Sequence, residues 1–189
     1  MNRPAPHAEA EKFFDRIAED YRQRSEGEVY NTGSLSFRRR RDIVQRIIDG
    51  TPSGGVVLDY GMGPGLFTRY STERGCHFVG IDISARMIEL AEARQIANAE
   101  YHQGDIDILG RFAGTADLVL LIGLIDYLVD PPGALRELAA CVRPGGRLAV
   151  SFRNHRSLPR FLRNVSKDVW KHLRRRRRTD GEGLGTAFE

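Results

Sequence analysis

Residues 56–65 read Val56-Val57-Leu58-Asp59-Tyr60-Gly61-Met62-Gly63-Pro64-Gly65. A short apolar segment ends in a carboxylate and breaks into three alternate glycines, after which Leu66 to Thr72 can continue as a helix. Glycine lacks Cβ, so the backbone can turn tightly and approach a ligand, while a following helix N-terminus offers unpaired N–H groups. The stretch is typical of a nucleotide-cofactor loop. A tight strand-to-helix turn without a ligand is the alternative that the loop alone leaves open.

The length of 189 residues suits one domain of ordinary size. No run approaches the roughly 18 apolar residues of a membrane span, and Met1 to Pro4 lead into charged sequence, so we expect a cytoplasmic protein. Cys76 and Cys141 are isolated and have no metal-ligand spacing. We therefore expect two buried thiols and no metal site.

The net charge of +4 is unevenly distributed along the chain. Residues 153–178 contain eleven Lys or Arg and one acid, which leaves a net charge of −6 on the remainder. The basicity therefore belongs to one C-terminal segment, and it does not indicate that the whole domain binds nucleic acid.

Apolar positions predict two helices, Ala8 to Arg24 and Arg38 to Asp49, with Gly27 to Ser36 as the loop between them. From Val56 onward, short apolar strands alternate with amphipathic helices. The expected strands are Val56–Asp59, His77–Ile81, Ala99–His102, Leu118–Ile122 and Arg147–Phe152, and the expected helices are Gly65–Arg74, Ala85–Gln95 and Pro132–Cys141. Such alternation predicts an α/β fold with a doubly wound, Rossmann-like, mostly parallel sheet.

Local signals support these boundaries. Ser84 can cap the helix that begins at Ala85, and Pro131-Pro132 can open the later helix. Pro144-Gly145-Gly146 is expected to end that helix in a turn.

Polar groups follow the predicted strands at their carboxyl ends, where open parallel sheets bind ligands. Asp82 lies 21 residues beyond Gly61, at the end of the second strand, where a carboxylate can accept both ribose hydroxyls. Gly104-Asp105-Ile106 follows the third strand, where a carboxylate and a backbone N–H can read an adenine edge. The buried strand from Asp117 leads into Leu124-Ile125-Asp126-Tyr127.

This combination resembles the class I S-adenosylmethionine-dependent methyltransferases. Within that class, it is similar to the small-molecule branch that includes ubiquinone and menaquinone biosynthesis enzymes. The resemblance runs from about Phe13 to Phe152, and it includes Phe14-Asp15-Arg16-Ile17-Ala18, Tyr21 and the turn from Val142 to Leu148. It implies methyl transfer from S-adenosyl-L-methionine to a small-molecule acceptor by direct displacement. We expect strand order 3-2-1-4-5, preceded by the two helices.

The resemblance also implies cofactor contacts. Methionine would be held by Asp59, by the backbone of Gly61, Gly63 and Gly65, and by the backbone near Ile122. Asp82 would bind the ribose, and adenine would meet Ile83, Asp105 and the Ile106 N–H. Met62 and Pro64 stand where the family often has Cys and Thr, a mild departure because backbone does most of the binding there.

Two other functions remain open at this point. An NAD(P)-dependent oxidoreductase also needs a glycine loop and a ribose carboxylate, but its Gly-x-Gly-x-x-Gly fingerprint requires glycine where this chain has Leu66. A catalytically silent S-adenosylmethionine-binding module would carry the same cofactor contacts. Taken one at a time, Asp59, Asp82 or Asp105 could also be a carboxylate that caps a helix or lies in a loop without binding a ligand. Ile83 could simply be a core residue.

Methyl transfer from a sulfonium needs alignment and exclusion of water, not a covalent nucleophile. A general base would help with a hydroxyl or acidic-carbon acceptor. The weak candidates for that base are Tyr127, Asp126, His155, Tyr21 and Tyr30.

We expect a methyltransferase core over residues 1–152 and a basic amphipathic helix and tail over 153–189. Residues 157–178 carry an apolar and a basic stripe at helical spacing, which suits a substrate lid. The alternatives are an interfacial helix for anionic lipid or an acidic amphiphilic substrate, a solvated helix, and an RNA contact.

The family usually ends with a helix and an antiparallel strand pair, and Thr179 to Glu189 is too short to supply it. The edge strand Arg147–Phe152 would then be uncovered, so we expect either an incomplete chain or a homodimer that covers the edge.

Overall fold

A computed structural model describes residues 6–26 and 32–152 of the chain. The helices are α1 (Pro6–Glu26), α2 (Thr32–Asp49), α3 (Thr68–Glu73), α4 (Ala85–Glu92) and α5 (Pro131–Cys141). The strands are β1 (Val56–Tyr60), β2 (His77–Asp82), β3 (Ala99–Gln103), β4 (Ala116–Leu121) and β5 (Val142–Val150). Two short 3-10 helices, η1 (Ile106–Phe112) and η2 (Ile125–Tyr127), follow β3 and β4.

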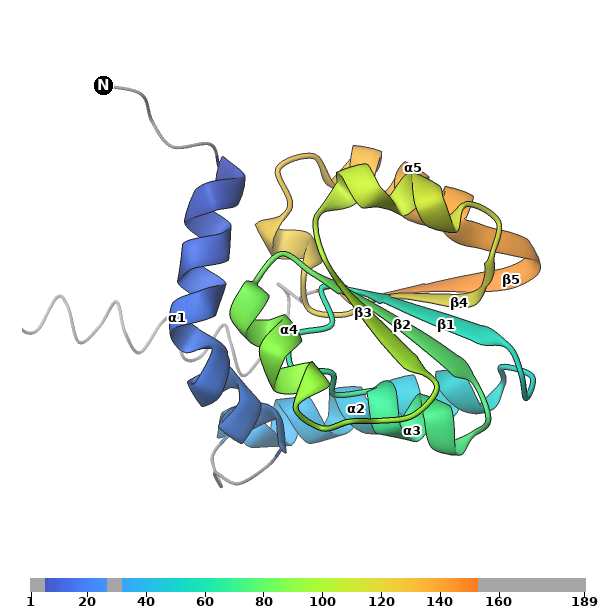
Figure 1. Cartoon of the computed structure of the whole chain (residues 1–189), viewed down its shortest axis with the longest axis horizontal. Coiled ribbons are helices and arrows are strands. Elements are labelled where there is room, and N and C mark those ends of the chain that lie inside the picture. Colours follow the sequence, from blue (N-terminus) through green and yellow to red (C-terminus); the bar gives the residue numbers. More distant parts are fainter. Residues whose placement is uncertain (1–5, 27–31, 153–189) are drawn as a thin grey trace, which may run out of the picture. The chain divides into compact units, whose positions relative to one another are not determined.

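The five strands form one parallel sheet in the order β3-β2-β1-β4-β5, which confirms the predicted fold class, strand order and two preceding helices. β1 lies at the centre, with Asp59 in register with Gly80 of β2 and Leu120 of β4. In Figure 1, α5 lies over one face of the sheet and α2 and α3 lie over the other. The sheet is therefore covered on both faces, as its apolar strands require.

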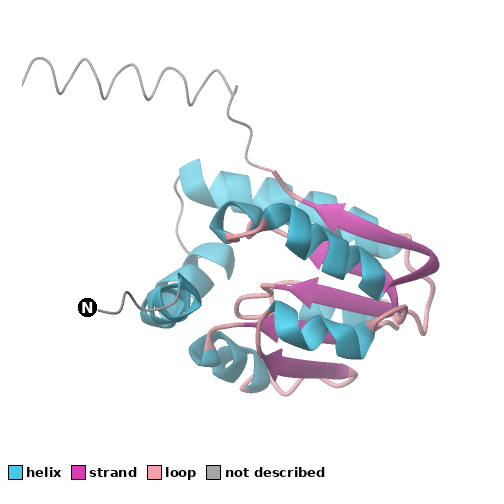
Figure 2. Ribbon diagram, turned by 90° about the horizontal axis from the view of Figure 1, so that it is seen from above, coloured by secondary structure: helices cyan, strands magenta, loops and turns pink. Residues whose placement is uncertain are grey.

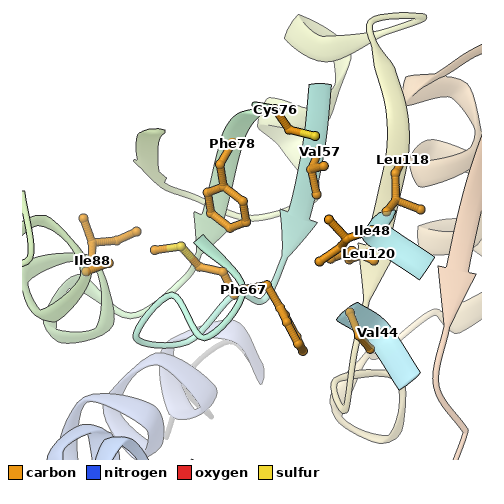
Figure 3. Close-up of a cluster of buried hydrophobic side chains, with 11 residues drawn as sticks. Val44, Ile48, Val57, Phe67, Cys76, Phe78, Ile88, Leu118 and Leu120 are labelled. Carbon is orange, nitrogen blue, oxygen red and sulfur yellow. The ribbon is translucent and has the colours of Figure 1, made fainter. Parts of the chain in front are cut away.

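Each face of the sheet has its own core. Under α2 to α4, Ile48, Phe78 and Ile88 pack with Leu118 and Leu120 (Figure 3). On the other face, Leu58, Ile81 and Val119 pack against Leu109 of η1 and Leu138 of α5. Most of these side chains are fully buried, and each contributes about 1.5–3 kcal/mol to folding.

Several element boundaries differ from those expected. The helix after the glycine loop begins only at Thr68, because residues 62–68 form turns in which Gly65 N–H donates to the Met62 carbonyl and Thr68 N–H to that of Gly65. The loop expected over Gly27–Ser36 is wrong from Thr32 onward, where α2 already runs; a single glycine is a weak helix breaker.

The turn expected at Pro144-Gly145-Gly146 lies inside β5. There the strand leaves the ladder between the pairs Ala116–Val142 and Leu118–Arg147, and Gly145 has φ +81°. Pro144, Gly145 and Gly146 thus form a bulge in β5 rather than the end of α5. The two 3-10 helices were not predicted from the sequence.

The expected caps are present. Ser84 Oγ accepts from the Met87 N–H at 3.1 Å and donates to Asp15 Oδ1 at 2.6 Å, which joins α1 to the start of α4. Asp130 caps α5 and Pro131 occupies its first turn. Cys76 and Cys141 are buried and unpaired, as predicted.

The expected 153–189 segment, with its amphipathic 157–178 stretch, lies outside the described residues. Within the part that the structure describes, β5 pairs with β4 alone, and no helix is both long and apolar enough to cross a bilayer.

Asp117 ties three strands together and gives a stability prediction. Its Oδ2 accepts from the Val56 N–H at 2.9 Å and its Oδ1 pairs with the Arg143 guanidinium. We expect Asp117→Ala to lower the free energy of unfolding by about 2 kcal/mol, because the β1 amide loses its partner. Urea denaturation measures the change, with Asp42→Ala on the exposed side of α2 as the control; equal losses in both variants would contradict it.

Candidate functional site

The carboxyl ends of the parallel strands meet at one edge of the sheet, and Figure 2 shows their arrowheads on the side of α1. All nine residues predicted to bind a cofactor lie in or just after β1 to β4 at this edge: Asp59, Gly61, Gly63, Gly65, Asp82, Ile83, Asp105, Ile106 and Ile122. The structure thus brings the predicted residues together along one edge; it does not test their binding roles.

The three glycines of the loop are required by its backbone. Gly61, Gly63 and Gly65 have φ of +73°, +58° and +76°, a region that other residues rarely adopt. A Cβ on Gly61 would lie 2.4 Å from Leu124 Cδ2, and one on Gly65 would lie 2.7 Å from Thr68 Oγ1. Larger side chains at Gly61 and Gly65 would therefore be both strained and in collision with neighbouring residues.

Met62 fits beside the loop because β2 carries a glycine next to it. Met62 is 4% exposed, and a Cβ on Gly80 would lie 2.1 Å from the Met62 sulfur. The Met62 side chain thus fills space that a side chain at position 80 would otherwise occupy.

Asp82 joins the glycine loop to the start of α4. Its Oδ2 accepts from the Gly63 N–H at 2.8 Å and its Oδ1 from the Ser84 N–H at 2.9 Å. Burial raises the pKa of Asp82, and these backbone hydrogen bonds oppose the rise. Each oxygen keeps a lone pair, so the fixed carboxylate can still accept from a ligand hydroxyl.

Asp59 is a buried carboxylate with an unmet hydrogen-bonding need. It is 1% exposed, and its Oδ2 has no hydrogen-bond partner among the described residues. Burial, with the negative charge of Asp82 as a second cause, raises the pKa of Asp59 to about 8. A cationic ligand group at this edge would relieve both effects.

Asp105 is held by a residue that the sequence reasoning missed. The hydroxyl of Tyr60, the last residue of β1, donates to Asp105 Oδ1. Burial raises the pKa of Tyr60, so the phenol stays protonated. A signal was available: a tyrosine in an apolar strand needs a partner for its hydroxyl.

Helix α1 reaches this edge through aromatic side chains. A Cβ on Gly63 would lie 3.4 Å from Tyr21 Cε1, so the Tyr21 ring lies over the glycine loop. Burial raises the pKa of Tyr21, which favours it as a hydrogen-bond donor and disfavours it as a general base. Phe14 of α1 meets Tyr127 of η2 with ring centroids 5.4 Å apart.

Arg40 is a second residue that the sequence reasoning missed. Its Nη1 lies 2.5 Å from where a Cβ of Gly123, just after β4, would be. Arg40, Val44 and Ile48 follow at intervals of four, so helical spacing placed this arginine on the buried face of α2.

The base candidates differ in position. Tyr127 is 50% exposed and Asp126 is exposed beside it, while His155 and Tyr30 lie outside the described residues. Among the described side chains, no three His, Cys, Asp or Glu are grouped to hold a metal ion.

The sequence pattern of a family described as a methyltransferase domain matches residues 34–182. The chain belongs to this methyltransferase family. The match confirms the family predicted from the sequence and supports the predicted cofactor, S-adenosyl-L-methionine.

Two curated relatives are named as O-methyltransferases. The ubiquinone biosynthesis O-methyltransferase of Coxiella burnetii is 31% identical over 76% of this chain and 60% of that protein. The malonyl-[acyl-carrier protein] O-methyltransferase of Enterobacter lignolyticus is 32% identical over 85% of this chain and 57% of its own length. The chain thus spans less than two thirds of these methyltransferases.

Among solved structures, the magnesium protoporphyrin IX methyltransferase of Synechocystis with bound S-adenosylmethionine has a TM-score of 0.69. It is 20% identical, and the match covers 82% of this chain and 80% of that one. At this identity the likeness shows that the methyltransferase shares the fold.

The raised pKa of Asp59 predicts a pH-dependent stability. Between about pH 4 and pH 8, folding keeps a proton on Asp59 that the unfolded chain releases, so this group's contribution to stability falls as pH rises. We expect the free energy of unfolding of Asp59→Asn to be no larger than that of the wild type near pH 5. By pH 8, it should exceed the wild-type value by at least about 1 kcal/mol.

Urea denaturation at pH 5, 6.5 and 8 measures this difference, with Asp42→Asn on the exposed side of α2 as the control. A difference between Asp59→Asn and wild type that stays constant across these pH values would refute the buried, proton-holding state of Asp59.

Proposed function

We propose that this protein binds S-adenosyl-L-methionine at the carboxyl edge of β1 to β4 and transfers its methyl group to a small-molecule acceptor by direct displacement. The observation that carries the proposal is the buried Asp59 carboxylate, whose Oδ2 has no partner in the described part of the protein. The donor is a cation at its sulfonium and carries an ammonium group, so it supplies what this carboxylate lacks.

The charge at this edge favours that donor over a dinucleotide. Burial and, second, the negative charge of Asp82 raise the pKa of Asp59, so a positive ligand group is favoured here over further negative charge. The pyrophosphate of NAD would bring two negative charges to the same loop. It would also find no adjoining helix N-terminus, because α3 is short and begins three residues beyond Gly65. The oxidoreductase alternative is therefore disfavoured on electrostatic grounds.

Each donor group has a suitable partner in this arrangement. Asp59 would pair with the methionine ammonium, and the Arg40 guanidinium beside Gly123 suits the methionine carboxylate. Asp82, held by two backbone N–H groups, would accept from the ribose hydroxyls. Adenine would lie among Ile83, Asp105 and Ile106.

The donor supplies a methyl group that is already activated on sulfur. The chain's own task is alignment and exclusion of water, and Tyr21 of α1, lying over Gly63, would close the site. Since burial keeps the Tyr21 phenol protonated, Tyr21 would position a group by hydrogen bonding rather than remove a proton.

The acceptor would enter past an aromatic ledge, formed by Phe13 and Phe14 of α1 and Tyr127 of η2. Phe13 is 40% exposed and Tyr127 is 50% exposed, and the ring of Phe14 contacts both. An acceptor with an apolar body suits this approach.

Isothermal titration calorimetry tests the proposal, with S-adenosylmethionine, S-adenosylhomocysteine and NAD as ligands. We expect binding of the first two and none of NAD. Asp82→Ala should weaken donor binding at least about thirtyfold, because the ribose hydroxyls and the Gly63 N–H lose their acceptor. Asp82→Asn, which keeps one acceptor oxygen, should lose less.

Asp107→Ala is the matched control, since Asp107 is an exposed carboxylate two residues beyond Asp105. A folded Asp82→Ala protein with wild-type affinity would reject the ribose role. Formation of S-adenosylhomocysteine in the presence of hydroxyl acceptors or a malonyl thioester distinguishes the enzyme from a silent binding module, which would bind the donor and turn over none of them.

A further inference from the structure

We infer that Tyr60 is a positioning residue that sets the base preference of the donor site, by holding the Asp105 carboxylate in the orientation that accepts from the adenine amino group. This inference rests on the proposed function and adds a residue to it. Its central observation is the hydrogen bond between the Tyr60 hydroxyl and Asp105 Oδ1, which joins positions 45 apart in the chain.

The orientation of Asp105 does not come from its own helix. Asp105 is the residue before η1, but its side chain makes no capping hydrogen bond to that helix. Its backbone carbonyl accepts from the Ile108 N–H, so the main chain is held while the carboxylate is directed to β1. The Tyr60 hydroxyl is thus a constraint on the side chain that the local turn does not supply.

Tyr60 is suited to impose this constraint because it cannot move or ionise easily. It is 4% exposed and packs in the apolar core on the α5 side of the sheet. Burial, followed by the bond to Asp105, raises the pKa of Tyr60, so the phenol remains a donor. A phenol has one hydrogen to give, and therefore Asp105 must turn an acceptor oxygen toward it.

An ionised carboxylate is an acceptor only, which makes its orientation selective. Adenine presents an amino group at its 6-position, whereas hypoxanthine presents a carbonyl oxygen there. A carboxylate fixed beside the 6-position accepts a hydrogen bond from the adenine amino group. It repels hypoxanthine, because the carboxylate oxygen and the carbonyl oxygen are both acceptors with no proton between them. A carboxylate free to rotate would lose much of this discrimination.

Tyr60→Phe separates positioning from packing, since it keeps the buried ring and removes only the hydroxyl. The chain offers a matched control in Tyr70→Phe. The Tyr70 hydroxyl also donates to a carboxylate, Asp49 Oδ1, at 2.7 Å, but that pair joins α3 to the end of α2. Both substitutions therefore remove one phenol–carboxylate hydrogen bond.

The experiment compares the affinities of the full-length protein for S-adenosylhomocysteine and S-inosylhomocysteine by calorimetry. Tyr60→Phe should reduce the ratio of the two affinities roughly tenfold, while Tyr70→Phe should leave the ratio unchanged. Thermal unfolding of both variants checks that the fold persists. Asp105→Asn should lower the ratio as well, and the double variant with Tyr60→Phe should lower it no further, because the two side chains act as one unit.

A Tyr60→Phe protein that keeps the wild-type ratio within about twofold would overturn the inference. So would an equal loss of affinity for both ligands, which would mean that the hydroxyl supports only the structure. Wild-type protein that binds neither ligand would instead remove the proposed function, and the inference with it.

Discussion

The bond network of Asp82 is the interaction on which the site depends. One carboxylate oxygen accepts from the Gly63 N–H in the glycine loop after β1, and the other accepts from the Ser84 N–H after β2. A single side chain therefore holds these two loops together. This is possible because β1 and β2 are parallel and in register, with Asp59 beside Gly80. Gly80 in turn leaves room for the Met62 side chain, which fills the space beneath the loop.

The same arrangement carries an energetic cost in the free protein. Asp59 is buried next to Asp82, and its Oδ2 has no hydrogen-bond partner among the described residues. Because its pKa is raised to about 8, the side chain holds a proton at neutral pH and no isolated charge is buried. A cationic donor would replace that proton. The proposed function therefore implies that part of the binding free energy is stored as instability of the free site, a common relation between stability and activity in enzymes.

Much of this could be predicted from the sequence because its signals were local and mutually consistent. Strand-to-helix alternation predicted the parallel sheet, the family resemblance supplied its strand order, and Ser84 marked the start of α4. The late start of α3 at Thr68 was missed because the turns after Gly65 depend on hydrogen bonds that spacing does not reveal. The Tyr60–Asp105 bond was missed for a different reason: it joins two strands' ends, and only the fold brings them together.

The most direct test of this account is a crystal structure of the protein with S-adenosylhomocysteine. The account predicts the ribose hydroxyls within hydrogen-bond distance of Asp82, the ammonium on Asp59 and the adenine amino group on Asp105, with the backbone of the glycine loop unchanged. A ligand bound away from the carboxyl ends of β1 to β4, or bound there in the reverse orientation with adenine near Gly123, would contradict it.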